Sequence, residues 1–267
     1  MIKDFSIDMY KELLSSLQDA GYQFITFSQY IRLEETNTLP TRFIILRHDV
    51  DDLPQNSMDF ADIQAQFKVK GTFYFRIVPR SFDKAIIRKM LNQGHEVGYH
   101  YETMDTSSGN VDEAYEEFLK HLKTFEGIHS VETISMHGSP LSKFDNRDIW
   151  RKYNYKDLGL IGEPYFDFNF NEVLYITDTG RAWDGHKYNI RDRAPRENPL
   201  TNPDFINRSY HSTSDIISAI REGSFPCKVM MNFHPERWTN NNTLWLKQLL
   251  NQFLKNQVKR IIVLSKS

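Results

Sequence analysis

The feature that most constrains this chain is segment 42–52, which reads Arg-Phe-Ile-Ile-Leu-Arg-His-Asp-Val-Asp-Asp. An apolar run rich in β-branched residues is typical of a buried strand, and this one ends abruptly in basic and acidic residues. Because strand side chains alternate between two faces, Arg47, Asp49 and Asp51 share one face. Two carboxylates on one face repel each other unless a cation or a shared proton lies between them. The pattern therefore favours a metal site or an acid/base pair.

A helix cap is the alternative for this cluster. Asp51 or Asp52 could close the helix that we expect to start near Pro54, and we expect capping to occupy Asp52. Capping leaves Arg47 and Asp49 unexplained, so the functional interpretation is preferred.

Composition excludes several classes of function. With 40% hydrophobic and 25% charged residues the chain resembles an ordinary soluble globular protein, and its net charge of −2 argues against a general nucleic-acid binder. The single cysteine, Cys227, excludes an internal disulfide and a Cys-based zinc site. The first residues have no apolar segment of a signal peptide and no stretch approaches a membrane span, so we expect a cytoplasmic location.

Strand-like and helix-like segments alternate along the chain. We expect strands at 23–27, 42–50, 70–77, 96–100, 132–137, 173–178, 228–234 and 260–264, and helices at 8–20, 28–35, 55–68, 81–94, 111–125, 214–221 and 244–255. This alternation predicts a parallel sheet with right-handed crossovers. About seven such units predict an α/β fold, a distorted or incomplete (β/α) barrel, in one domain of residues 1–267 with a loop-rich insertion at 138–210 near the site. An open doubly wound sheet is the alternative.

Polar residues that can do chemistry lie at the C-terminal ends of four expected strands. These residues are Asp49, Asp51, His100, His137 and His234. In a parallel β/α fold such ends face one rim, where active sites lie. We therefore expect the five side chains to share a site.

Two histidines lie at the two ends of the segment that holds the expected strand 96–100. His95 and His100 differ by an odd number and so point to opposite faces, which assigns His95 to a backbone contact. Gly98 is expected to clear space beneath His100. Glu102 shares the face of His100 and is either a partner of a metal ligand or a ligand itself.

Four motifs carry a family resemblance. They are Arg-His-Asp-Val-Asp at 47–51, Gly-Thr-Phe-Tyr-Phe at 71–75, Gly-His-Glu-Val-Gly-Tyr-His at 94–100 and Asn-Phe-His-Pro at 232–235. Together they resemble the polysaccharide deacetylases of carbohydrate esterase family 4, and more narrowly a divergent bacterial branch associated with surface-polysaccharide synthesis. The resemblance implies a distorted β/α barrel that removes N- or O-linked acetyl groups from a carbohydrate with a divalent metal, commonly zinc.

The same resemblance implies roles for single residues. Asp49 would be the general base that activates water, and His234 the acid that protonates the leaving amine. Asp51 and His100 would bind the metal. Mixed oxygen and nitrogen ligands with open positions for water suit a borderline cation such as zinc.

The chain departs from the family at the second metal histidine, because Met104 stands at its position. A thioether is a weak ligand for a borderline cation, so a third ligand should come from elsewhere. His137 is the preferred candidate and Glu102 the second; hydrogen bonding of His137 to substrate is the alternative. The family's arginine-and-proline motif is also absent, and residues 135–140 replace it.

Further polar residues are expected around the site. The resemblance implies that Asp178 or Asp184 orients His234, while Trp183 either stacks on a sugar ring or pins its loop to the barrel. Arg47 and Arg76 could hold Asp49 or a substrate carboxylate, or could form ordinary ion pairs.

Two further functions compete with deacetylation. Because of Met104, the chain could be a non-catalytic relative that binds carbohydrate. A phosphatase that uses Asp49 and Asp51 as an aspartyl pair ranks last, because it leaves His100 and His234 without a role.

Overall fold

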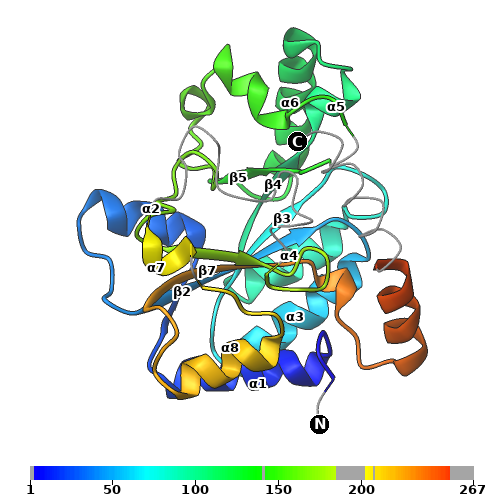
Figure 1. Cartoon of the computed structure of the whole chain (residues 1–267). Coiled ribbons are helices and arrows are strands. Elements are labelled where there is room, and N and C mark those ends of the chain that lie inside the picture. Colours follow the sequence, from blue (N-terminus) through cyan, green and yellow to red (C-terminus); the bar gives the residue numbers. More distant parts are fainter. Residues whose placement is uncertain (1–2, 140–141, 185–201, 207, 253–267) are drawn as a thin grey trace.

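The computed structural model describes residues 3–139, 142–184, 202–206 and 208–252. In these residues seven parallel strands form one sheet, in the order β5-β4-β3-β2-β7-β6 with β1 beside β2, and the sheet curls into a half-barrel (Figure 1). The strands are β1 (Gln23–Ile25), β2 (Phe43–Val50), β3 (Thr72–Phe75), β4 (Glu96–Tyr101), β5 (Ile134–Met136), β6 (Leu174–Thr177) and β7 (Lys228–Phe233). This architecture confirms the predicted distorted and incomplete (β/α) barrel.

Helices flank the sheet, with α1 and α8 side by side on one face (Figure 1). The helices are α1 (Ile7–Asp19), α2 (Phe27–Glu35), α3 (Pro54–Gln66), α4 (Lys84–Asn92), α5 (Thr103–Thr106), α6 (Val111–Glu126), α7 (Pro203–Ile206) and α8 (Thr213–Arg221). Short 3-10 turns are η1 (Asn146–Arg151), η2 (Tyr155–Leu158) and η4 (Pro235–Arg237). The predicted strand 260–264 and the end of the predicted helix 244–255 lie outside the described residues.

Strand β2 is the centre of the sheet, and all eight of its residues are buried. On one side it pairs first with β1 and then with β3, and on the other side it pairs with β7. His48 lies on the face opposite Asp49, as alternation predicts, and its ring stacks on Phe73 with centroids 4.1 Å apart. Because the strand is covered on both edges and both faces, its first half is a continuous apolar run, Phe43 to Leu46.

The insertion after β5 covers that strand's outer edge. Ile161 donates its backbone N–H to Glu132, Ile134 donates to Gly162, and Met136 N–H donates to the Glu163 carboxylate. Covering an edge in this way satisfies backbone groups that would otherwise be exposed. Within the described residues no hydrogen-bonded strand pair joins β5 to β6, so the barrel is open on this side.

The start of α3 corrects one expectation. Asp52 accepts the N–H of Leu53, 2.8 Å away, and within the described residues its side chain makes no bond that caps the helix. The N-cap position is Leu53, in the left-handed region with φ 48°, and no side chain caps it. Pro54 at the first helical position has no N–H to satisfy, which reduces the need for a cap.

Two other helices begin close to the predicted positions. Thr26 forms a capping box with Gln29 at the start of α2, which was expected to begin at residue 28. Asp83 caps α4, which was expected to begin at residue 81. Ser81 lies before this helix and donates its hydroxyl to the carbonyl oxygen of Val50.

Candidate active site

The carboxyl ends of β2, β4, β5 and β7 bring Asp49, His100, His137 and His234 to one rim of the sheet. The register places the end of β7 directly beside that of β2, because His48 pairs with Phe233. Likewise His100 on β4 pairs with Ser135 on β5. These residues therefore share one rim although up to 185 residues separate them in sequence.

Asp49 is held by three hydrogen bonds. Arg47 donates to both of its oxygens, from Nε at 2.9 Å and from Nη2 at 2.8 Å. Asn232 donates to Oδ2 at 2.9 Å. Such a bidentate pair fixes the carboxylate in one orientation on the floor of the site.

Arg47 itself is fixed by its packing. It is fully buried, its guanidinium lies over the rings of Tyr74 and Tyr165 at 5.6 and 5.3 Å, and Nη2 donates to the Ser135 hydroxyl. Tyr74 can approach because Gly98 has no side chain: a Cβ there would lie 2.5 Å from the ring. Gly98 thus makes room for Tyr74 rather than for His100, which corrects the sequence interpretation.

Asp51 lies between two histidines. Its Oδ1 is 3.6 Å from Nε2 of His100 and 3.4 Å from Nε2 of His137. Within the described residues this buried oxygen has no hydrogen-bond partner. Burial raises the pKa of Asp51, but His137 and His100 outweigh it and hold the pKa well below its usual range.

The proton on His100 can be assigned from its partner. Nδ1 lies 2.9 Å from the carbonyl oxygen of Ser135, which can only accept, so Nδ1 carries the proton. Burial lowers the pKa of His100 to about 4, against the effect of the two aspartates, so the ring is neutral near pH 7. Nε2 therefore presents a lone pair toward the carboxylate of Asp51.

The lone-pair atoms of Asp51 and the two histidines fit a divalent cation. A lone pair and a carboxylate oxygen facing each other are repulsive, and a cation between them removes the repulsion. Ligand atoms on a tetrahedral ion with bonds of about 2.1 Å are about 3.4 Å apart, close to the 3.4 and 3.6 Å seen around Asp51. In the described part of the chain, no group of three or more His, Cys, Asp or Glu side chains is arranged as a complete metal site. The fit rests on the two distances and on the unpartnered Oδ1.

His234 is paired with Asp178. Its Nδ1 lies 2.6 Å from Oδ1 of Asp178, while its backbone N–H and Nε1 of Trp238 donate to Oδ2. Burial and Arg237 lower the pKa of His234, but Asp178 outweighs both and raises it to about 9. His234 is therefore protonated near pH 7 and can donate a proton. Of the two aspartates considered from the sequence, the one beside His234 is Asp178.

Glu102 is not isolated on the rim. Arg76 donates to both of its oxygens, and Nδ1 of His137 lies 3.2 Å from Oε2. Burial raises the pKa of Glu102, but hydrogen bonds from His137 and Arg76 outweigh it and lower the pKa to about 2. Arg76 thus pairs with Glu102, whereas Arg47 pairs with Asp49.

Three other predicted residues lie away from this cluster. Trp183 is 5% exposed, donates to the Thr213 hydroxyl and packs on Phe233, which matches the loop-pinning interpretation and leaves little ring surface for a sugar. Asp184 pairs with the exposed His211. His95 contacts backbone groups of Gly71 and Ala61, as predicted.

Sequence reasoning missed three residues at the site. Asn232 could have been found, since it precedes His234 by two and so shares its face. Ser135, which contacts Arg47 and His100, has the same spacing from His137. Glu163 had no signal: it comes from the insertion, and burial raises the pKa of its carboxyl to about 7.

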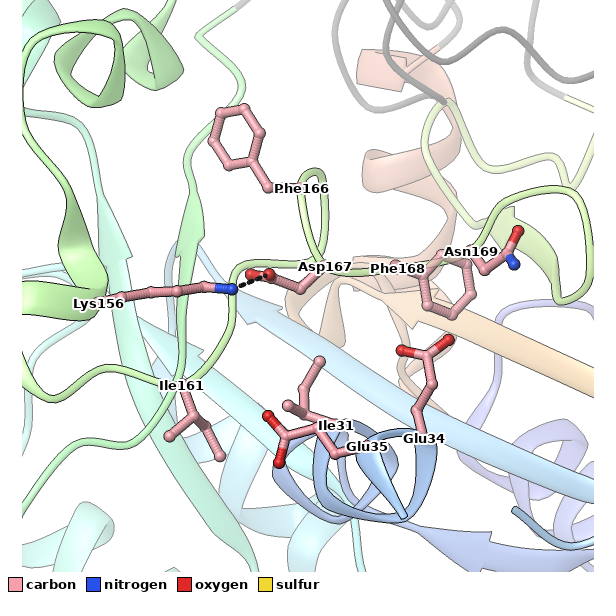
Figure 2. A pocket seen from close by; sticks show the side chains of 9 residues that line it. All are labelled: Ile31, Glu34, Glu35, Lys156, Ile161, Phe166, Asp167, Phe168 and Asn169. Atoms are coloured by element: carbon pink, nitrogen blue, oxygen red, sulfur yellow. Dashed lines mark ion pairs between the residues drawn. The ribbon is translucent and has the colours of Figure 1, made fainter. Parts of the chain in front are cut away.

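The cavity drawn in Figure 2 is separate from the rim cluster. It has a volume of about 460 Å³ and lies between α2 and the segment that follows η2. Its lining includes Glu34, Lys156, Asp167 and the half-exposed Phe166, and none of the strand-end residues.

No helix within the described residues has both the length and the apolar character needed to cross a membrane.

No protein-family model and no curated protein matches this chain. Solved structures that it resembles include the deacetylase PplD of Streptococcus pyogenes in complex with acetate, at 17% identity and a TM-score of 0.47, over 56% of this chain and 70% of that one. IcaB from Ammonifex degensii is also 17% identical, with a TM-score of 0.43 over 54% and 71% of the two chains.

A third structure, of the pseudoenzyme BA3943 of carbohydrate esterase family 4 from Bacillus anthracis, is 13% identical, with a TM-score of 0.43 over 84% and 66%. The family named for this third structure, carbohydrate esterase family 4, is the one that the motifs at 47–51, 71–75, 94–100 and 232–235 resemble.

Proposed function

We propose that this chain is a metal-dependent hydrolase that removes acetyl groups from an N-acetylated sugar, with a surface-glycan precursor as the substrate. The observation that carries the proposal is the arrangement of two histidines around Asp51. Its Oδ1, which has no hydrogen-bond partner among the described residues, lies 3.6 and 3.4 Å from Nε2 of His100 and His137. Asp51, His100 and His137 would hold the ion. Asp49 would act as the general base and His234 as the general acid.

The residues divide the proton transfers of amide hydrolysis between them. Water attacks the acetyl carbonyl while Asp49, oriented by Arg47, accepts the proton of that water. The carbon–nitrogen bond then breaks as His234 donates a proton to the departing nitrogen, which leaves acetate and a free amine. A bound divalent ion would supply Lewis acidity that polarises the carbonyl and makes water more acidic.

The test combines two measurements on the protein purified without chelator. Metal content is determined by mass spectrometry, and acetate release is followed with N-acetylglucosamine oligomers as substrates. We expect about one zinc per chain and acetate release that a chelator abolishes. Zinc-loaded protein that releases no acetate from any N-acetylated sugar would contradict the proposal.

Fractionation of cells that express the native chain tests the expected cytoplasmic location.

A second candidate is a carbohydrate-binding relative without catalysis. It is favoured by Met104, a buried residue at the position where the family has a metal histidine. In that case the protein holds no metal and hydrolyses nothing, yet binds glycan in an equilibrium assay. The first candidate holds a metal ion and the second holds none, so the measured metal content decides between them.

A further inference from the structure

His137 faces a carboxylate at each ring nitrogen. Nε2 is 3.4 Å from Oδ1 of Asp51, and Nδ1 is 3.2 Å from Oε2 of Glu102. The hydroxyl of Ser139 lies 3.1 Å from the same Nδ1. A hydroxyl can donate or accept, but an ionised carboxylate can only accept. Glu102 therefore favours a proton on Nδ1.

Glu102 is held in place from the opposite side. Arg76 donates from Nε to Oε1 at 3.1 Å and from Nη2 to Oε2 at 2.6 Å. A third contact, from Nη1 at 3.3 Å to the backbone carbonyl of Asp51, ties this arginine to the loop that carries Asp51. The side chains of Arg76 and Glu102 are 7% and 12% exposed, so water competes little for these bonds.

We infer that Glu102, clamped by Arg76, is a positioning residue that puts the proton of His137 on Nδ1 and turns the lone pair of Nε2 toward Asp51. His100 presents its Nε2 to the same oxygen, with its own proton fixed by the Ser135 carbonyl. Histidine ligands of metals are commonly oriented in this way by a carboxylate or a carbonyl on the other nitrogen.

The inference rests on the proposed function and explains how the site can bind metal without a histidine at the position of Met104. The thioether of Met104 cannot act as a strong ligand. His137 comes instead from β5, the neighbour of β4, and needs a second group to fix its tautomer. Arg76 on the loop after β3 and Glu102 after β4 supply that group.

The first test reads the tautomer directly and does not require metal. In the full chain labelled with ¹⁵N-histidine, nitrogen shifts of His137 distinguish a proton on Nδ1 from one on Nε2. The parent should carry the proton on Nδ1. In Glu102→Gln one acceptor oxygen must serve both Arg76 and His137, so the proton should redistribute between the nitrogens.

Two results overturn the inference. One is a His137 ring that is doubly protonated in the parent, bridging Asp51 and Glu102 as a cation without a lone pair. The other is a tautomer that Glu102→Gln leaves unchanged. If the variant is unstable, the double variant Arg76→Met/Glu102→Leu replaces it, because removing both charges leaves no buried ion unpaired.

The second test is zinc affinity by titration calorimetry. Glu102→Gln should bind zinc about 10- to 100-fold more weakly than the parent, as is typical when a partner of a metal ligand is lost. Glu96→Gln is the matched control: Glu96 starts the same strand, accepts from Ser28 N–H and the Thr72 hydroxyl, and lies at the opposite end from the rim. This control should bind zinc like the parent.

Failure of the inference can be told from failure of the proposed function. If the parent binds no zinc, the metal-dependent function is wrong, and the tautomer measurement still decides the role of Glu102. If the parent binds zinc and Glu102→Gln binds it equally well, only the positioning role is wrong.

Discussion

Each carboxylate at the rim has a different set of partners, and these partners distinguish its chemistry. Asp49 accepts three hydrogen bonds from Arg47 and Asn232 and so is fixed in orientation. Asp51 has one buried oxygen without a donor, in the described residues, between two histidines. Asp178 accepts the Nδ1 proton of His234 and keeps that ring charged.

Asp49→Asn should separate catalysis from metal binding. The amide cannot accept the proton of water, so kcat should fall about 10²- to 10⁴-fold, the usual contribution of a general base. Zinc affinity should change little, because Asp49 lies outside the proposed ligands. Asp51→Asn, measured alongside, should lose both. Loss of zinc binding in Asp49→Asn would assign Asp49 to the ligands instead.

Asp178→Asn should lower the pKa of His234 from about 9, because burial and Arg237, which lower it, would then be opposed only by the smaller effect of Glu236. The folded pKa is raised, so the stabilisation from this pair is fully present below about pH 6.5, the unfolded value. It is lost as the pH rises through about 9. Proton NMR of His234 gives the pKa, and urea unfolding at several pH values gives the stability. Asp184→Asn, whose partner His211 is exposed, is the control; equal shifts in both variants would refute the assignment.

His137→Ala should weaken zinc binding by more than the 10- to 100-fold typical of a ligand's partner. Met104→His should strengthen binding, or restore it in the double variant. Met104 is 3% exposed, so this change also places a polar ring in a buried position, and the melting temperature should be recorded with the affinity. If His137→Ala leaves zinc affinity intact and only raises KM, His137 is a substrate contact.

At the scale of elements, the contact between β3 and β4 positions Asp49, the proposed base. Tyr74 on β3 fits against Gly98 on β4 and lies over the guanidinium of Arg47 on β2. A chain of close contacts thus connects three adjacent strands to the orientation of Asp49. Any side chain at Gly98 must push Tyr74 or the carbonyl of Thr133 away.

Gly98→Ala should destabilise the fold by about 1–3 kcal/mol, the usual cost of overpacking a core. Its Cβ would lie 2.4 Å from the carbonyl oxygen of Thr133 and 2.5 Å from Tyr74. Gly127→Ala is the control, because its nearest neighbour is the Thr124 carbonyl at 3.7 Å and its φ is −67°. Urea unfolding measures both variants. A Gly98→Ala variant as stable as the parent would show that Tyr74 is free to move.

At the scale of the whole molecule, the proposed site joins strands from both halves of the chain. Asp51 and His100 come from its first half, whereas His137 follows the midpoint and His234 lies close to the C-terminus. A ligand that binds only when these strands are assembled stabilises the entire fold.

Zinc should therefore raise the melting temperature, and a chelator should lower it again. At a free concentration 100 times the Kd the stabilisation is about 2.7 kcal/mol. His100→Ala should show no such shift, since it removes a proposed ligand. Calorimetric melting with and without zinc measures the effect; an equal shift in His100→Ala would place the zinc elsewhere.

The local pattern of the sequence determined the elements and the faces of the strands. The apolar run of 43–46 determined the buried central strand, and a spacing of two put Arg47 and Asp49 on one face. The odd spacing of His95 and His100 determined that their side chains point to opposite faces of the strand, and in the structure the two rings contact different backbone groups. These properties follow from backbone periodicity, which neighbouring residues encode by themselves.

Tertiary structure alone decided which of these residues meet. Sequence patterns left Asp178 and Asp184 equivalent beside His234, and left the ring of Trp183 either on a sugar or in the core. Strand register and packing of the insertion resolved both, with Asp178 at His234 and Trp183 against Phe233. Contacts between residues tens to hundreds of positions apart depend on how strands pair and helices pack, and no local period encodes that arrangement.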